Sequence, residues 1–170
     1  MQQFVNSADI ETGADELADV GSAAAWLATH VPADDRPGRI TERDRQTLVA
    51  VREALRALLV ANAGADLDGT AIDTLDQAGQ EAKLIVHMER DGTARLRAAG
   101  RGVDRIVGLI LAAMAEAMQA GTWSRLKACP DDECHWAFYD NSRNRSRTWC
   151  SMAVCGNRAK ARSFRERHRP

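Results

Sequence analysis

The sequence predicts an α+β protein, with a mainly helical body that contains one β-hairpin, followed by a small module built around four cysteines. Three observations support this fold class. Apolar residues recur at helical intervals through much of residues 1–124, one Asp-Gly pair separates two strand-like runs, and all the cysteines lie in residues 129–155. We therefore expect two units, residues 1–124 and residues 125–170.

The first helix is predicted from a capping signal. Thr12 and Asp15 have the spacing of a capping box, and apolar residues follow at helical intervals. This pattern predicts a helix over about residues 13–29. Two prolines and a glycine in residues 31–39 cannot continue it, so that segment is expected to be a solvated connection.

The second and third helices follow this connection. Thr41 and Asp44 repeat the capping signal, and an apolar stripe behind them predicts a longer helix that ends near Gly64. Ile72 and Leu75 indicate a shorter third helix. The body is thus expected to begin with three helices in succession.

A β-hairpin is predicted next. Residues 84–90 and 93–97 are rich in β-forming or alternating residues, and Asp91 and Gly92 separate them. An Asp-Gly pair in that setting is typical of a hairpin with a two-residue loop.

The longest helical pattern of the body comes last. Apolar residues recur through residues 103–118, and Gly121 is placed to end the helix. Met114 and Met118 lie on the apolar face and are expected to fill the core.

Residues 1–124 contain no combination of side chains that predicts catalysis. His30 and His87 have no Cys or acid at a telling spacing beside them, and a lone histidine is more often structural. We therefore expect that the protein is not an enzyme. No basic segment followed by an apolar run opens the sequence, and no stretch is apolar enough to span a membrane, so we expect a cytoplasmic protein.

The cysteines form two Cys-x4-Cys pairs separated by fifteen residues. Two close pairs joined by a short insert are typical of a zinc site, because Zn²⁺ takes four thiolates at tetrahedral corners about 2.3 Å away. Two disulfides or an iron-sulfur cluster are the alternatives, but disulfides belong to oxidising compartments. The predicted metal ligands are Cys129, Cys134, Cys150 and Cys155.

The chain around the cysteines predicts a small finger. Residues 136–139 are expected to form a strand, residues 140–147 a polar turn, and residues 148–150 a returning strand, after which the sequence favours a helix through Arg167. This order is treble-clef-like. Such a module is too small to fold on core burial alone, so bound zinc should supply much of its stability.

The finger is basic and the body is acidic. Residues 125–170 hold 11 Lys and Arg against 5 Asp and Glu, a net charge of +6, whereas residues 1–124 hold 12 against 19, a net charge of -7. Four thiolates around one Zn²⁺ would lower the charge of the finger to about +4. The asymmetry favours an anionic partner for the finger, although the two units could instead neutralise each other.

Nucleic-acid contacts are expected from two sets of arginines. On the C-terminal helix, Arg158, Arg162, Arg165 and Arg169 share one stripe and are expected to face water or a partner, while Phe164 and the residues near it face the protein. The polar turn adds the second set. The candidate contacts are Arg143, Asn144, Arg145, Arg147, Asn157, Arg158, Arg162 and Arg165.

Two of these residues have an alternative role. Asn157 and Arg158 follow the last cysteine directly, and they could hold the finger together by hydrogen bonds around the zinc. More generally, the arginines could be solvated and shield the thiolates without contacting nucleic acid.

The finger resembles the CGNR zinc finger family of bacterial proteins. The resemblance rests on the Cys155-Gly156-Asn157-Arg158 run, on Trp149 and on the spacing of the cysteines. The body resembles the ABATE domain through the segment Phe4-Val5-Asn6-Ser7, although Ser7 stands where threonine is expected, and through the hairpin and long helix before the finger. The resemblance implies a stress-related transcription regulator with a DNA-binding finger.

We therefore expect a zinc-binding regulator whose finger contacts DNA. The body could serve as a sensor for a small-molecule effector, although no pocket is evident from the sequence, or it could form a homodimer, since single fingers usually need a second copy for specificity. A protein-interaction module with a purely structural zinc finger and an RNA-binding protein are the alternatives.

Overall fold

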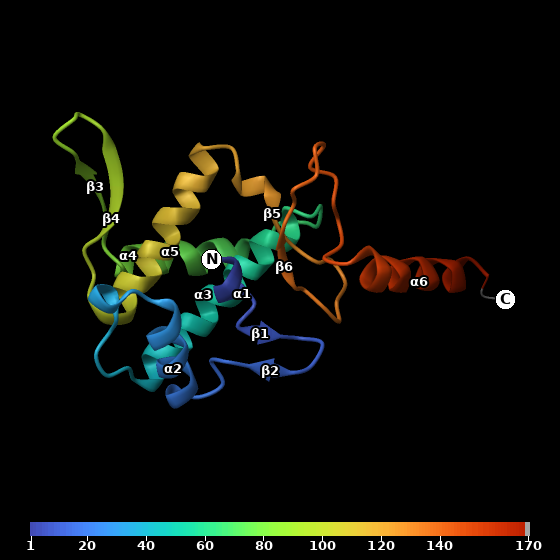
Figure 1. The fold of residues 1–170 in the computed structure, drawn as a ribbon, viewed down its shortest axis with the longest axis horizontal. Coiled ribbons are helices and arrows are strands. Elements are labelled where there is room, and N and C mark those ends of the chain that lie inside the picture. The colour runs from blue at the N-terminus through green and yellow to red at the C-terminus, as the bar shows by residue number, and fades with distance from the viewer. Residues whose placement is uncertain (169–170) are drawn as a thin grey trace.

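The computed structural model describes residues 1–168, drawn in Figure 1. Its α-helices are α1 (Gln2–Val5), α2 (Val20–His30), α3 (Glu42–Ala61), α4 (Gly69–Glu81), α5 (Gly102–Gln119) and α6 (Asn157–Arg167). Its strands form antiparallel pairs, β1 (Ala8–Asp9) with β2 (Ala14–Asp15), β3 (Leu84–Met88) with β4 (Ala94–Ala98), and β5 (Leu126–Ala128) with β6 (Ala137–Tyr139). Short helical turns are η1 (Ala33–Asp35), η2 (Trp123–Arg125) and η3 (Met152–Gly156). The predicted fold class, mainly helical α+β, is confirmed.

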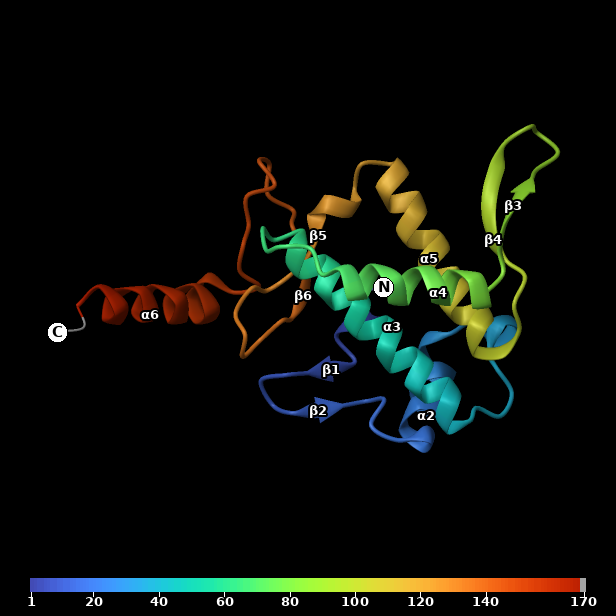
Figure 2. The same ribbon diagram turned by 180° about the vertical axis from the view of Figure 1, so that it is seen from behind.

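Helix α3 lies at the centre of the body. It contacts α1, α2, α4, α5 and β5, and its predicted apolar stripe of Leu48, Val51, Leu55 and Leu59 is buried. The β3–β4 hairpin stands at one end of the molecule and α6 projects from the other end, as both ribbon views show (Figures 1 and 2). The hydrophobic core also includes Ala128 and Ala137 of the finger. The β5–β6 hairpin is therefore packed directly on the body.

The start of the chain differs from the prediction. Thr12 and Asp15 do not cap a helix, because the segment around them forms the β1–β2 hairpin and Asp15 accepts hydrogen bonds from Arg52 of α3, at 2.6 and 2.9 Å. Helix α2 begins later, after Asp19, whose side chain accepts a hydrogen bond from the backbone N–H of Ser22 at 2.9 Å. The predicted first helix exists, but its predicted start near residue 13 is wrong.

Two helix ends agree with the sequence signals. Thr41 and Asp44 form the predicted capping box, in which each side chain accepts a hydrogen bond from the other residue's backbone N–H. Gly121 ends α5 with a positive φ of 66°. Its N–H and that of the next residue donate to the carbonyls of Met118 and Ala117, the pattern of a Schellman motif.

The loop of the β3–β4 hairpin is one residue longer than predicted. Glu89 donates its backbone N–H to the carbonyl of Thr93 at 2.8 Å, and Gly92 donates to the carbonyl of Glu89 at 3.1 Å. Three residues therefore lie between the hydrogen-bonded pair Glu89 and Thr93 that extends the two strands, and the third, Gly92, has a φ of 84°. A three-residue loop of this kind consists of a turn followed by one residue with left-handed φ. Like a two-residue loop, it therefore favours glycine at this position.

Within residues 1–168, no helix combines the length and apolar composition that crossing a bilayer requires.

Candidate metal centre and basic surface

The structure brings the four cysteines together. The Sγ atoms of Cys129, Cys134, Cys150 and Cys155 all lie within 4.8 Å of one another, and those of Cys150 lie 3.4 Å from Cys134 and 3.6 Å from Cys155. Sulfurs at tetrahedral corners around Zn²⁺ would be about 3.8 Å apart, because each Zn–S bond is about 2.3 Å long. A disulfide would need about 2.05 Å. The cluster therefore fits one four-coordinate metal ion.

Two turns present these thiols. The first follows β5, where Cys129 donates its backbone N–H to the carbonyl of Trp136 and Cys134 donates to that of Asp131. The second is η3, which ends at Gly156. A Cβ at Gly156 would lie 2.5 Å from Sδ of Met152 and 3.3 Å from Trp149. A side chain at this position would therefore displace Met152, which is 53% exposed, and would pack tightly against Trp149.

The thiols need a cation to become thiolates together. Burial raises the pKa of Cys134 to about 11, and burial and the neighbouring thiols also raise the pKa of Cys150. Burial acts on Cys155 in the same direction, but hydrogen bonds from Arg158 and the other three thiols together outweigh it and lower the pKa of that thiol. Four buried sulfurs so close together can all ionise only if a metal ion compensates their charge.

Arg158 joins the cluster to its surroundings. Its guanidinium donates to Sγ of Cys155 at 3.3 Å and forms ion pairs with Asp131 at 3.0 Å and Glu11 at 3.1 Å. Arg162, one turn further along α6, also pairs with Asp131 at 3.0 Å. Burial would raise the pKa of Asp131, but Arg162 and Arg158 outweigh this effect and lower it. These two arginines therefore face the first cysteine turn.

The orientation predicted for α6 is wrong on two points. Arg158 and Arg162 lie against Asp131 rather than pointing wholly to solvent, and Phe164 is 57% exposed instead of facing the protein. Phe164 stacks on His168, the residue that follows α6, with ring centroids 4.1 Å apart. A helical wheel shows which residues share a face, but it does not show which face lies toward the protein. Arg169 lies outside the described residues.

A buried ion pair shapes the polar turn between Asp140 and Arg147. Nζ of Lys127 donates to Oδ2 of Asp140 at 2.8 Å and to the carbonyls of Arg145 and Arg147, at 2.7 and 2.9 Å. Burial would raise the pKa of Asp140, but hydrogen bonds from Lys127, Ser142 and the backbone of Arg147 hold it well below its usual range. The three N–H groups of the Lys127 ammonium and the carboxylate of Asp140 all have hydrogen-bond partners. They fix the turn, which has no strand pairing of its own.

The strand pairing of the finger also differs from the prediction. Residues 148–150 do not form a returning strand, and β6 pairs instead with β5, with Lys127 opposite Phe138. Strands β5 and β6 lie directly before and after the first cysteine turn, so a short loop is enough to pair them. The segment after the polar turn needs no ladder, because Arg147 donates to the carbonyls of Trp149 and Cys150.

The predicted nucleic-acid contacts divide into two groups. Among residues 1–168, Arg143, Asn144, Arg145 and Arg165 are exposed and form no ion pair. The others make contacts within the finger. Arg147 lies 4.6 Å from the centre of the Phe138 ring, Asn157 donates to the carbonyl of Ala153, and Arg158 and Arg162 pair with Asp131.

Other polar residues at this site were not predicted. Asp131, Lys127 and Asp140 are almost fully buried in the finger, and Arg52 and Arg56 are 3% exposed on α3. The two α3 arginines follow one another at a spacing of four beside the apolar stripe, which was a usable signal for buried charge. The sequence signal for Asp131 was weaker, because it consists only of an acid between two cysteines near a basic helix.

The finger is joined to the start of the chain by directed hydrogen bonds. Arg56 donates to the carbonyls of Val5 and His135, at 2.7 and 3.0 Å. Asn6 donates to the carbonyl of Ala137 at 2.9 Å and accepts from its N–H at 2.7 Å. The side of the finger that faces the body is therefore fixed, and α6 points away from it (Figure 1).

Comparison with known families agrees with this geometry. Residues 125–168 match the CGNR zinc finger, and residues 1–121 match ABATE, a family described as "Putative stress-induced transcription regulator". Both descriptions are of regulator or zinc-finger types. No curated protein matches the chain. The cysteines are positioned to coordinate one metal ion, consistent with zinc. The chain belongs to the ABATE family and carries a C-terminal CGNR zinc finger.

Proposed function

We propose that this protein regulates transcription by contacting DNA with its basic finger, which zinc bound by Cys129, Cys134, Cys150 and Cys155 holds in shape. The observation that carries the proposal is the exposure of α6. None of its eleven residues is buried, and five are Lys or Arg against a single acid, Glu166. Apart from Phe164 and two alanines the helix is polar, so burial against the protein stabilises it little. A polyanion would complement it.

Among the predicted nucleic-acid contacts, we assign to DNA the four that are exposed and whose side chains form no ion pair or other contact described above within the finger. Arg143, Asn144 and Arg145 extend from the polar turn, and Arg165 lies two turns along α6. Arg147, Asn157, Arg158 and Arg162 then have a positioning role, since each already contacts the finger. This division supports a structural role for Asn157 and Arg158, in which they hold the finger together by hydrogen bonds around the zinc.

The body is proposed to act as the regulatory part. Its net charge of -7 keeps DNA away from it and leaves the finger as the contact surface. A single short helix reads few base pairs, so useful specificity would need a second copy of the chain or flanking contacts. We propose the boundary between body and finger at residues 124 and 125.

The test is DNA binding by purified, zinc-quantified protein across a salt series. Changing Arg143, Arg145 and Arg165 to alanine should lower the slope of log K against log salt by about 2 to 3, because each phosphate contact contributes about 0.9. The matched control changes Arg90, Arg95 and Arg97 to alanine. These arginines lie in the β3–β4 hairpin at the far end of the molecule (Figure 2), and the control should keep the wild-type slope.

Either of two results would contradict the proposal. Zinc-loaded protein that ignores DNA would favour the protein-interaction module, and equal losses in both triple variants would indicate a response to net charge alone. An RNA hairpin of equal charge, measured in parallel, separates the RNA-binding alternative from DNA binding.

A further inference from the structure

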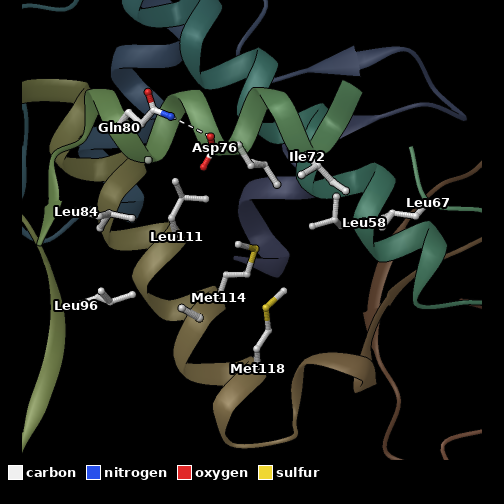
Figure 3. A pocket seen from close by; sticks show the side chains of 13 residues that line it. Leu58, Leu67, Ile72, Asp76, Gln80, Leu84, Leu96, Leu111, Met114 and Met118 are labelled. Atoms are coloured by element: carbon white, nitrogen blue, oxygen red, sulfur yellow. Dashed lines mark hydrogen bonds between the residues drawn. The ribbon is translucent and has the colours of Figure 1, made fainter. Parts of the chain in front are cut away.

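The body contains an open apolar groove, which extends from the β3–β4 hairpin to Leu58 of α3. It lies between α4, α5 and the β3–β4 hairpin and has a volume of about 620 Å³. Figure 3 shows that Leu111, Met114 and Met118 of α5 point into it, with Leu84 and Leu96 of the hairpin on one side. This volume lies within the range of about 300–1,000 Å³ that small-molecule sites occupy.

The groove is not closed by the side chains around it. Met118 is 45% exposed, so the prediction that it fills the core is wrong, and Leu67 and Ile72 at the rim are 57% and 45% exposed. Its floor is formed partly by Gly79, where an added Cβ would lie in ordinary contact with Leu84 and Leu111, at 3.6 and 3.7 Å. Apolar surface is thus left in water on three elements at once.

The hairpin turns its apolar face to this groove. Along β4, Leu96 faces the groove while its neighbours Arg95 and Arg97 point to the other side of the strand, as alternation requires. Arg95 lines two other hollows, one of which shares Leu96 and Ala115 with the groove. The hairpin therefore turns an apolar side chain to the groove and adds no charged residue to its lining.

The groove carries one ionised group. Asp76 is the single charged residue among those that line it, and Gln80 donates a hydrogen bond to its Oδ2 at 2.9 Å, which holds the carboxylate at the edge (Figure 3). Helix α4 adds Asp73 and Glu81 and contains no Lys or Arg. The α4 side of the groove is therefore acidic, which favours a cation over an anion beside Asp76.

We propose that this groove binds a lipophilic cation, an apolar organic molecule with one positive charge. The leucines and methionines would enclose the apolar part, since methionine side chains adapt to irregular shapes, and Asp76 would lie beside the charge. This assignment does not depend on whether the finger contacts DNA. It gives the body a ligand class that could act as its signal.

The experiment uses two probes of equal shape and opposite charge, tetraphenylphosphonium and tetraphenylborate. Each is titrated into the full-length, zinc-loaded protein by calorimetry. We expect saturable binding of the phosphonium at one molecule per chain. The borate should bind on the order of tenfold more weakly, because the same carboxylate attracts one probe and repels the other. Methyl NMR signals of Met114 and Met118 should shift with the phosphonium.

Two substitutions localise the effect. Asp76→Asn should weaken phosphonium binding by about two- to fivefold, the range for an exposed ion pair, and should narrow the difference between the probes. Ala115→Trp places a large ring in the groove, which Ala115 lines, and should abolish binding. Ala113→Trp is the matched control, because Ala113 is exposed on the same helix and does not line the groove.

Several outcomes would overturn the proposal. Equal or tighter binding of tetraphenylborate would show that the groove does not prefer a cation. If neither probe saturates, the groove is not a binding site. Sedimentation that shows a dimer, dissociated by Ala115→Trp, would identify the groove as an interface between copies. If Ala115→Trp does not fold, Asp76→Asn and the methyl shifts still decide the question. DNA binding is measured separately, so its failure and this one are distinguishable.

Discussion

Replacing Arg158 with alanine should weaken zinc binding, even though the residue is not a ligand. Its guanidinium contacts Sγ of Cys155 at 3.3 Å and pairs with Asp131 at 3.0 Å and Glu11 at 3.1 Å. Four thiolates around Zn²⁺ carry a net charge of about -2, and Arg158 is the cation that donates directly to one of them. Loss of a residue that orients a metal ligand costs about 10- to 100-fold in affinity. We expect a loss of that size.

The assay is competition for zinc with a chromophoric chelator at fixed pH and salt. Arg158→Lys should fall between wild type and alanine, because it keeps the charge but loses the planar guanidinium that reaches Cys155 and three acids, Asp131, Glu11 and Glu133. Arg165→Ala is the control, since it removes the same charge from the same helix. Within residues 1–168, the side chain of Arg165 donates a hydrogen bond only to the carbonyl of Ala161. An affinity of the alanine variant within twofold of wild type would refute this account of Arg158.

Other predictions concern stability. Gly108→Ala should destabilise the body by about 1–3 kcal/mol in urea unfolding, because the new Cβ would lie 2.5 Å from that of Ala98. An unchanged urea midpoint would show that the β3–β4 hairpin can move away from α5 without a loss of stability. The hydrogen bonds from Arg52 lower the pKa of Asp15, so their contribution is complete above about pH 4 and is lost as pH falls through the folded-state pKa. Asp15→Asn should therefore be less stable than wild type at pH 7, and the gap should shrink in acid. Chelating the zinc should abolish amide protection of the finger while α3 stays protected in hydrogen exchange; full retention would contradict a stabilising role for the metal.

The features that sequence predicted well depend on neighbouring residues. The capping box at Thr41, the helix end at Gly121 and the hairpin around Gly92 are each specified by a few adjacent side chains and the φ angles they permit. The cysteine cluster was predictable for a related reason. Its spacing limits the chain to a geometry that a tetrahedral ion can satisfy.

The features that were predicted wrongly depend on residues that are distant in the sequence. Asp15 has a capping spacing from Thr12, yet Arg52, 37 residues away, forms a stronger, charge-assisted pair with its carboxylate. Likewise, the stripe of α6 was correctly periodic, but its orientation is decided by Asp131. No local rule connects these residues, because the fold alone brings them together.

The joint between Asn6 and Ala137 has a consequence for biosynthesis. The two residues exchange hydrogen bonds across 131 positions of the chain. On a ribosome, the segment that holds Asn6 therefore emerges well before the strand that it binds. Arg56 is likewise made before His135, whose carbonyl it binds. The nascent body can collapse around α3 beforehand, but its N-terminal edge closes only after the finger has left the exit tunnel.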